Sequence, residues 1–555
     1  MKTKLNNTII PLLLIFLGIS LPSDCQRPFP SVIELPEINI TYQETINSKK
    51  KIHAEITIDV DSLSGLIDFQ GYCGIEFHGN STLNAPKKSY DIELRDAEGN
   101  ELTRQLLDFG AEEDFILLAQ YFDKSHYRNA LAFNLWSRMG HYSPKYRHVK
   151  LNVNGEFQGT YLLVEKIKVD KNRLDLDIGT ADDWAVGDPF LVKFDNENPN
   201  YSSWPQNFQG ENITIKTIYP KNSYDDGYHL QFEFPYITDK LDEAIDNVSK
   251  GLRGKDHYHY RDFIDVASFV DYFLMTELSK NPDGFKRSVY FYRDRVSQDN
   301  STLSKIHMGP VWDFDLAFGN VNYGNYKSAE GWTYLQKRDS KNVDLFPAFW
   351  YKLLCDPEFV QQCISRLQEI KEMATKSNLE REAATLFHHI EQSMKLDTER
   401  WRGKTNQKAK PSAKGDWNQI SDVLDFYWRR LEWMEENLKY IRCIPPSSMY
   451  YELEYLQEIA PDLTSKRFVV PAIEHNPKVD TTEWYSYPQY YTYRLLNSSG
   501  EVLLKGPSSD TIYISYENLS PGDYYLEVFE NDENAPAISA VIESYYMMTK
   551  LTVPK

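Results

Sequence analysis

Three consecutive segments of the chain decide its fold: N-P-D-G-F-K-R-S (281–288), V-Y-F-Y-R-D (289–294) and G-P-V-W-D-F-D-L-A-F-G (309–319). The preceding residues, 262–280, carry apolar side chains at helical spacing, which predicts an amphipathic helix. Residues 289–294 alternate like a strand, and the chain then has to reverse before a second strand reaches the third segment. We therefore expect a hairpin that folds the acidic residues of the first and third segments together.

These acidic residues predict a cation site. Asp313 and Asp315 are two positions apart, so on an extended backbone their carboxylates point to the same face. Two carboxylates this close repel each other unless a cation lies between them, and hard oxygen ligands favour Mg²⁺ or Mn²⁺. Asp283 has two interpretations. It is either a functional carboxylate of this acidic site, or the aspartate of a common N-P-D-G turn that bonds its own backbone.

The first part of the chain, from about residue 31 to 94, consists of segments that alternate with a period of two, which predicts strands. A small polar loop interrupts them, and its backbone N–H groups are expected to bind phosphate. The loop consists of Gly79, Asn80 and Ser81. Lys88 shares the apolar face of the strand that follows, so we expect Lys88 rather than Lys87 to point inward. An ordinary strand whose lysine reaches solvent is the alternative.

Composition limits the possible functions. The chain has 555 residues, which suits two or three domains, and its formal net charge is −20 with a pI near 5.2. A protein this acidic lacks the basic surface that nucleic acids and anionic membranes require, so we expect no nucleic-acid partner. One lysine and a divalent cation are still enough to bind ATP locally.

The N-terminus resembles a secretory signal. Lys2 and Lys4 precede an apolar stretch, 9–21, that is too short to span a bilayer comfortably. We therefore predict a signal peptide over residues 1–25 and an exported protein that is secreted, periplasmic or at the cell surface. Cys25 raises the alternative of a lipid anchor, although Asp24 departs from the small residue expected before a lipidated cysteine.

Changes of pattern divide the rest of the chain. A β-rich lobe is predicted over about residues 31–165 and a helical lobe over about 166–444. After Ile444, residues 447–555 are dense in tyrosine, with short strands separated by turns, which predicts a small all-β sandwich. The expected fold class is α+β: two lobes with a cleft between them, followed by the β module.

Five ordered segments resemble the CotH family of spore-coat-type and bacterial surface proteins, which have an atypical protein-kinase fold. The similarity covers roughly residues 31–440. It is carried by G-N-S-T-L-N-A-P-K-K-S-Y (79–90), D-K-S-H-Y-R-N (123–129), N-G-E-F-Q-G-T-Y-L-L-V-E-K-I (154–167), N-P-D-G (281–284) and G-P-V-W-D-F-D-L-A-F-G (309–319).

The resemblance implies a two-lobed, exported protein kinase that uses ATP and Mg²⁺ or Mn²⁺ and phosphorylates Ser or Thr hydroxyls of surface or secreted proteins. Asp283 resembles the catalytic aspartate that receives the proton of the substrate hydroxyl. Ser288 stands five residues later, where kinases place a metal-binding asparagine. Asp313 resembles the metal-binding aspartate that follows the hairpin, and Asp315 lies beside it.

In the first lobe, Lys88 resembles the lysine that neutralises phosphate, and Glu165 lies in the stretch joining the lobes, where it is expected to contact ATP. The chain also departs from the kinase pattern. The predicted helix 125–139 has no acidic residue to pair with a lysine, and G-N-S-T is not a G-x-G-x-x-G loop. These departures support an alternative function, a catalytically silent kinase-like surface adhesin or glycan-binding protein.

Overall fold

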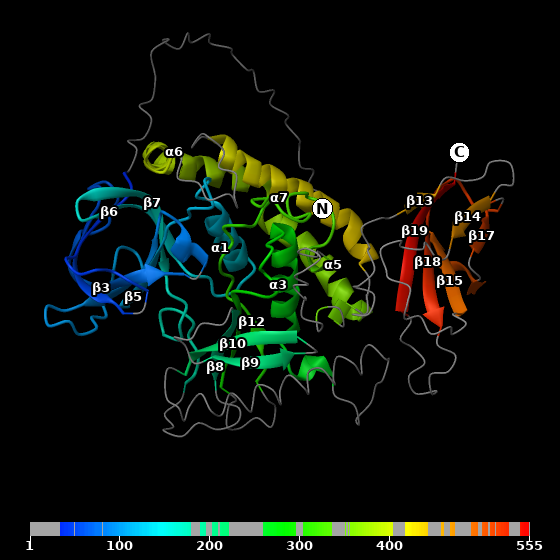
Figure 1. Ribbon diagram of the computed structural model, residues 1–555, viewed down its shortest axis with the longest axis horizontal. Helices are drawn as coiled ribbons and strands as arrows, with labels where there is room; N and C mark the ends of the chain where they lie inside the picture. The colour runs from blue at the N-terminus through cyan, green and yellow to red at the C-terminus, as the bar shows by residue number, and fades with distance from the viewer. Residues whose placement is uncertain are drawn as a thin grey trace, which may run out of the picture.

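A computed structural model describes most of the chain between residues 34 and 553 (Figure 1). The described ranges are 34–48, 50–79, 81–178, 189–195, 203–208, 211–220, 259–295, 304–335, 350, 353–354, 356–402, 417–441, 457–459, 467–471, 490–497, 502–508, 511–516, 518–531 and 544–553. The predicted signal peptide, Cys25 and Asn80 lie outside the described residues.

The first seven strands form a closed barrel in the order β1-β2-β3-β4-β5-β7-β6. The strands are β1 (Glu37–Thr41), β2 (Ile52–Asp59), β3 (Phe69–His78), β4 (Ser89–Arg95), β5 (Asp114–Leu118), β6 (Tyr146–Val153) and β7 (Glu156–Glu165). Alternate residues face the interior, which is filled by aliphatic and aromatic side chains such as Ile38, Ile92 and Phe115. An Asn154-Gly155 turn joins β6 to β7 in a hairpin, and both of its residues have positive φ.

The two-lobed kinase-like fold predicted from the sequence is wrong. The β-rich region closes on itself, because β1 pairs with β2 on one side and runs parallel to β6 on the other. The period-two pattern predicted the strands correctly but contains no information on whether the last strand returns to the first. A parallel pairing between Glu37 and Lys150 joins segments far apart in sequence, and no local signal predicts it.

A second layer packs beside the barrel around a large apolar core (Figure 1). Its sheet has the order β12-β11-β8-β10-β9. The strands are β8 (Phe190–Asp195), β9 (Ser203–Phe208), β10 (Glu211–Tyr219), β11 (Val289–Arg293) and β12 (His307–Met308). The helices are α1 (Arg128–Arg138), α3 (Val266–Ser279), α5 (Pro357–Met373), α6 (Lys376–Arg400) and α7 (Trp417–Asn437). Helix α6 packs against β7 and so connects the helical layer to the barrel.

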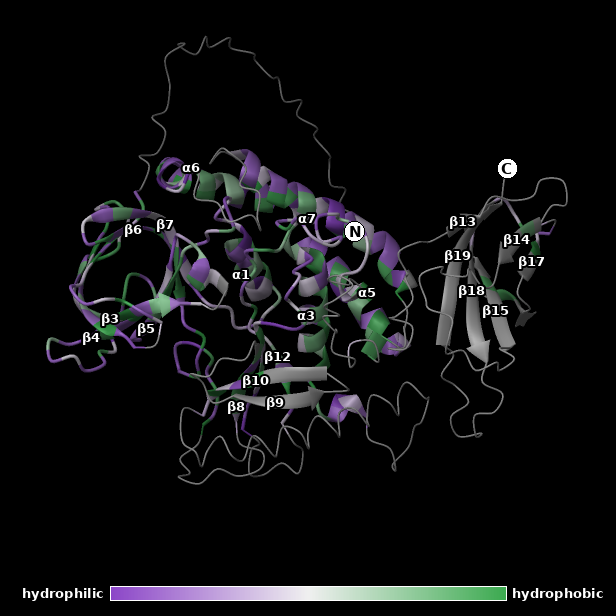
Figure 2. Cartoon of the chain, in the orientation of Figure 1, coloured by the Kyte–Doolittle hydropathy of each residue, from purple (hydrophilic) through white to green (hydrophobic). Residues whose placement is uncertain are grey.

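Hydrophobic patterning explains the burial of these helices. Nearly every residue of α3 is buried, whereas α6 and α7 bury one face each. Figure 2 shows hydrophilic and hydrophobic residues mixed along α6 and α7, as this one-sided burial requires. Among the described residues, no helix combines the length and the apolar character needed to cross a membrane.

The C-terminal strands form two sheets, in the orders β13-β19-β18-β15-β16 and β14-β17. The strands are β13 (Gln457–Ile459), β14 (Arg467–Pro471), β15 (Tyr490–Asn497), β16 (Val502–Ser508), β17 (Thr511–Ser515), β18 (Gly522–Asn531) and β19 (Ser544–Val553). Their strand content agrees with the all-β character expected of this region. The predicted domain boundaries are not tested by these features and stay predictions.

Candidate functional site

Helix α3 leads directly into the N-P-D-G turn. The helix ends at Lys280, which adopts a left-handed conformation with φ of 45°. Asp283 follows in a turn: its N–H donates to Asn281 Oδ1 at 3.2 Å, and its carbonyl accepts from the backbone N–H groups of residues 286 and 287 at 2.9 Å. The half-buried carboxylate of Asp283 accepts from Arg287 Nη1 at 3.2 Å. The turn interpretation of Asp283 is thus confirmed, and its role as a functional carboxylate stays a prediction.

The β11–β12 hairpin then returns the chain to this turn, as expected. Asn281 Nδ2 donates to the carbonyl of Asp313 at 3.3 Å, and Ser288 Oγ donates to Asp313 Oδ2 at 3.4 Å. Ser288 and Asp313 both have positive φ, 55° and 68°. Non-glycine residues in this conformation are uncommon, and they concentrate at functional sites. The structure thus brings the first and third sequence segments into contact.

Asp315 completes a group of carboxylates. The residues around Asp313 and Asp315 form a loop and a turn rather than the strand predicted, and Asp313 is exposed while Asp315 is partly buried. The pKa of Asp315 is raised well above its ordinary value by burial first, and then by the negative charges of Asp313, Asp123 and Asp283. Asp313 also lies within hydrogen-bonding reach of Asp315.

This donor set fits a hard divalent cation. Two carboxylates in contact share either a proton or a cation, and the hydroxyl of Ser288 adds a neutral oxygen beside Asp313. Oxygen donors of this kind suit Mg²⁺ or Mn²⁺. Asp313, Asp315 and Ser288 are therefore the residues that would hold the ion.

The D-K-S-H-Y-R-N segment anchors the acidic loop from the other side. Asn129, the second residue of α1, accepts from the backbone N–H of Phe314 through Oδ1 at 2.8 Å. Arg128 Nε donates to the carbonyl of Ala317 at 3.0 Å, and its Nη1 donates to the buried Asp123 at 2.6 Å. No role was assigned to these residues from the sequence. The run of polar side chains at the start of a helix could have indicated that they contact another segment.

The lysines before β4 are placed differently from the prediction. Lys87, not Lys88, is the fully buried residue, and its ammonium donates to Asp397 Oδ1 of α6 at 2.5 Å and to the Thr160 carbonyl at 2.6 Å. Lys88 is half-buried and donates to the Leu83 carbonyl at 2.5 Å. The expected inward orientation of Lys88 is therefore wrong, because both lysines precede the first residue of β4 and the strand alternation does not extend to them.

Gly79 begins a tight turn in the predicted phosphate loop. Its φ is 107°, and a Cβ at this position would lie 2.0 Å from Thr82 Oγ1, so only glycine fits. Ser81 starts a short 3-10 helix, Ser81–Asn84, whose Leu83 carbonyl accepts from Lys88. The proposed contact of this loop with phosphate stays a prediction.

Glu165 ends β7 and is bound by protein groups. Its carboxylate accepts from Arg173 Nη1 at 2.8 Å and from the backbone N–H of Lys145 at 3.0 Å. Burial raises the pKa of Glu165, and the N–H of Lys145 and the charge of Arg173 oppose that shift. The contact of Glu165 with ATP stays a prediction, and the structure shows a buried ion pair at this position.

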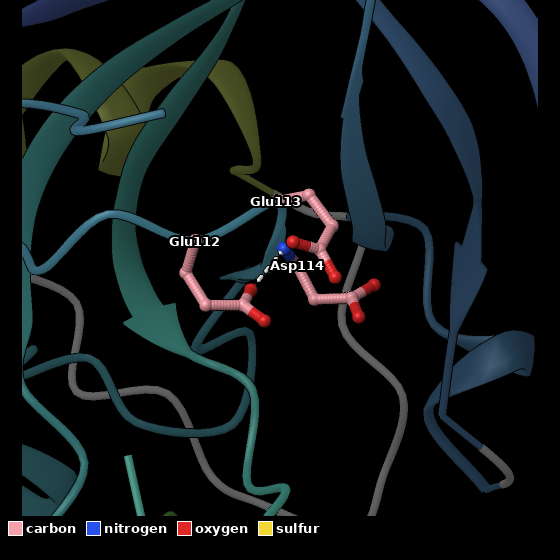
Figure 3. Close-up of side chains that lie close together, drawn as sticks. All are labelled: Glu112, Glu113 and Asp114. Atoms are coloured by element: carbon pink, nitrogen blue, oxygen red, sulfur yellow. Dashed lines mark hydrogen bonds between the residues drawn. The ribbon is translucent and has the colours of Figure 1, made fainter. Parts of the chain in front are cut away.

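A second acidic cluster lies at the start of β5 and was missed from the sequence. The carboxylates of Glu112, Glu113 and Asp114 approach one another, as Figure 3 shows. The ammonium of Lys168 pairs with all three of them. Lys51 and Lys166 also pair with Asp114, so cationic side chains of the protein already surround these carboxylates.

Comparison with known proteins agrees with this arrangement of motifs. A family model described as CotH kinase protein matches residues 75–434. Inner spore coat protein H of Bacillus subtilis (strain 168) is 22% identical over 259 residues, which cover 46% of this chain and 61% of that protein. The match thus spans less than two thirds of the relative. The matched residues include the barrel from the last part of β3 onward, the D-K-S-H-Y-R-N segment, the acidic loop and helix α6. The chain belongs to the CotH kinase protein family.

Proposed function

We propose that the chain is a metal-dependent phosphotransferase that transfers the γ-phosphoryl group of ATP to a Ser or Thr hydroxyl of a surface or secreted protein. The observation that carries the proposal is the convergence of Asp283, Ser288, Asp313 and Asp315 from two segments separated by a hairpin. Family membership supports it as well. The proposal depends on this local arrangement and not on a kinase-like fold.

The chemistry follows from the positions of these side chains. Asp283 orients the substrate hydroxyl and accepts its proton, and Arg287 holds the Asp283 carboxylate in place at 3.2 Å. A bond forms between the hydroxyl oxygen and the γ-phosphorus, while the bond from that phosphorus to the bridging oxygen breaks and ADP leaves with the electron pair. Asp313, Asp315 and Ser288 would hold the Mg²⁺ or Mn²⁺ ion, which would supply positive charge to neutralise the phosphate oxygens.

The remaining phosphate contacts are proposed on weaker grounds. Gly79 lets the backbone of the polar loop turn sharply, which suits N–H groups that approach a phosphate. Ser81 follows in the same loop, whereas Asn80 lies outside the described residues. The likeness to an inner spore coat protein supports a location at the cell surface or in a coat layer, where exported proteins would be the substrates.

Two aspartate variants and one control test the function. Asp313→Asn removes the charge but retains the backbone conformation, because asparagine tolerates positive φ. Asp283→Asn removes the proton acceptor. Glu391→Gln changes an exposed carboxylate on α6 that pairs with Lys395 and serves as the control.

Transfer of ³²P from γ-labelled ATP in the presence of Mn²⁺ is expected to fall at least about 100-fold in both aspartate variants. ATP with Mn²⁺ is expected to raise the melting temperature of wild type and Asp283→Asn, but not of Asp313→Asn, because only the last variant loses cation binding. If wild type shows neither transfer nor a shift at millimolar ATP, the phosphotransferase proposal is wrong and the adhesin or glycan-binding alternative gains support.

A further inference from the structure

Lys87 and Lys88 follow the predicted phosphate loop, and Lys124 belongs to the D-K-S-H-Y-R-N segment; of these three lysines only Lys124 lacks an oxygen partner among the described residues. Lys87 pairs with Asp397, and Lys88 donates to the Leu83 carbonyl. Lys124 is half-buried, and among the described residues no oxygen lies within hydrogen-bond or ion-pair distance of its ammonium group. The ammonium instead lies over the ring of Tyr121, 4.7 Å from its centroid.

The neighbouring aspartate does not neutralise Lys124. Asp123 is fully buried, and its carboxylate accepts from the Ser125 hydroxyl at 2.5 Å, from the Arg128 backbone N–H at 2.9 Å and from Arg128 Nη1 at 2.6 Å. Arg128 thus compensates the charge of Asp123. Lys124 remains a partly desolvated cation, which is unfavourable unless an anion is supplied from outside the described chain.

The backbone that carries Lys124 is rigidly held. Gln120 and His126, which flank the segment, have positive φ of 48° and 53°. The Asp123 N–H donates to the Gln120 carbonyl at 3.0 Å, and the His126 N–H donates to the Asp123 carbonyl at 3.3 Å. These bonds form two consecutive turns around Lys124. Its position therefore belongs to the fold and does not depend on a freely moving surface chain.

The same segment is joined directly to the acidic loop. Asn320 Nδ2 donates to the carbonyl of Phe122 at 2.7 Å and to the carbonyl of Asp315 at 2.6 Å. Arg128 contributes the second link, through the carbonyl of Ala317. Lys124 thus lies between two residues that are tied to the cation-binding loop, one on each side of it in sequence.

We propose that Lys124 is the cationic contact for the phosphate chain of the nucleotide, at a subsite beside Asp313 and Asp315. The inference rests on the proposed function and assigns to Lys124 the role that the sequence suggested for Lys88. The ligand class is a polyphosphate, since an ammonium bonds phosphate oxygens regardless of the base attached to them. Burial lowers the pKa of Lys124, and Asp397 and Asp123 oppose that shift, which is consistent with a desolvated cation.

Binding measurements on the full chain separate this inference from the proposed function. The probes are Mg·ATP, Mg·tripolyphosphate and adenosine, measured by calorimetry for wild type, Lys124→Met, Lys124→Arg and the matched control Lys88→Met. Lys124→Met is expected to weaken both polyphosphate probes about 30-fold, equivalent to about 2 kcal/mol, and to leave adenosine unchanged. Lys124→Arg is expected to retain most of the affinity.

Each other outcome counts against the inference in a distinct way. If wild type binds Mg·ATP and Lys88→Met weakens it while Lys124→Met does not, Lys88 is the contact and only this inference is wrong. If wild type binds neither polyphosphate, the inference and the proposed function both fall. Acetylation of wild-type lysines, followed by mass spectrometry, tests the subsite without any variant that could fail to fold. Mg·tripolyphosphate is expected to protect Lys124 from acetylation, and adenosine is not. Equal acetylation of Lys124 with both ligands would refute the subsite.

Discussion

The buried pair of Lys87 and Asp397 gives the sharpest stability prediction. Asp397 lies on α6, 310 residues after Lys87, and both side chains are essentially inaccessible to solvent. Asp397 Oδ1 also accepts from the backbone N–H of Thr160 at 3.0 Å. Burial lowers the pKa of Lys87 to about 8, and Asp397 opposes that shift. Replacing Asp397 with alanine therefore removes the counter-ion of a buried cation and the acceptor of a buried N–H.

The magnitude follows from these two losses. Without Asp397 the folded protein holds Lys87 neutral, whereas the unfolded chain keeps it protonated below a pKa of 10.5. Wild-type Lys87, with a pKa of about 8, stays protonated at pH 7, one unit below that pKa; because one pKa unit corresponds to about 1.4 kcal/mol, a variant that folds with Lys87 neutral loses about 1.4 kcal/mol at pH 7. The orphaned N–H of Thr160 adds about 1–3 kcal/mol. Asp397→Ala is thus expected to lower the free energy of unfolding by about 3 kcal/mol at pH 7.

The pH dependence of this effect has a definite sign. Below pH 8 the wild-type fold keeps its proton on Lys87 but the variant fold does not, so the variant gains stability relative to wild type as the pH rises. The difference between the two proteins is expected to shrink by about 1.4 kcal/mol for each pH unit from 6 to 8 and to level off above 8. Asp397→Asn, which retains an acceptor for Thr160, is expected to show the same slope with a smaller offset.

Hydrogen exchange in urea, followed by mass spectrometry of peptides from β7 and α6, measures this locally, because a chain of several parts need not unfold in one step. A loss of stability below 1 kcal/mol, or one that does not change between pH 6 and 8, would show that α6 does not neutralise Lys87. The double variant Lys87→Met with Asp397→Leu is expected to be more stable than Asp397→Ala. If the stability changes of Lys87→Met and Asp397→Leu, measured singly, sum to that of the double variant, the two side chains do not interact as an ion pair.

Two further predictions concern strand β6 of the barrel and the acidic loop. His148 is buried, donates through Nε2 to the His126 carbonyl at 2.7 Å, and has a pKa lowered to about 4 by burial. Since the unfolded chain takes up this proton from pH 6.5 downward, wild type is expected to lose about 2 kcal/mol of stability through His148 between pH 6.5 and 5. Chemical denaturation of His148→Gln should show a correspondingly shallower pH dependence. Asn129→Ala leaves the Phe314 N–H without its acceptor and is expected to weaken Mn²⁺ binding about 10-fold, measured by electron paramagnetic resonance. The control Asn134→Ala on the same helix loses the bond from the Tyr146 hydroxyl and should bind Mn²⁺ like wild type.

Local patterns predicted the elements and the convergence of the acidic segments. The helical spacing before residue 280 corresponds to α3, and a chain reversal after Asp294 is consistent with the β11–β12 pairing that places Asp313 beside Ser288. The roles of these residues in catalysis and metal binding stay predictions. Local patterns indicate the order of elements along the chain and their periodicity, and both were sufficient here because β11 and β12 are neighbours in that order.

Long-range pairing could not be read from the sequence. The barrel closes through a parallel contact of β1 with β6, and Lys87 finds its counter-ion on a helix at the far end of the family domain. Alternation selected Lys88 as the inward lysine, yet Asp397 pairs with Lys87, at a place where a Cβ on Gly159 would collide with the Asp397 carboxylate. Such contacts depend on how distant surfaces approach, which no window of residues contains.

The position of β1 has a consequence for handling the protein. The strand hydrogen-bonds to β2 on one edge and to β6 on the other, so it covers the two backbone edges at which the barrel would otherwise be open. A proteolytic cut that released residues 37–41 would expose both edges to other polypeptides, and exposed strands of this kind recruit neighbours into aggregates. The five residues of β1 thus help to keep a chain whose family domain exceeds 300 residues from aggregating.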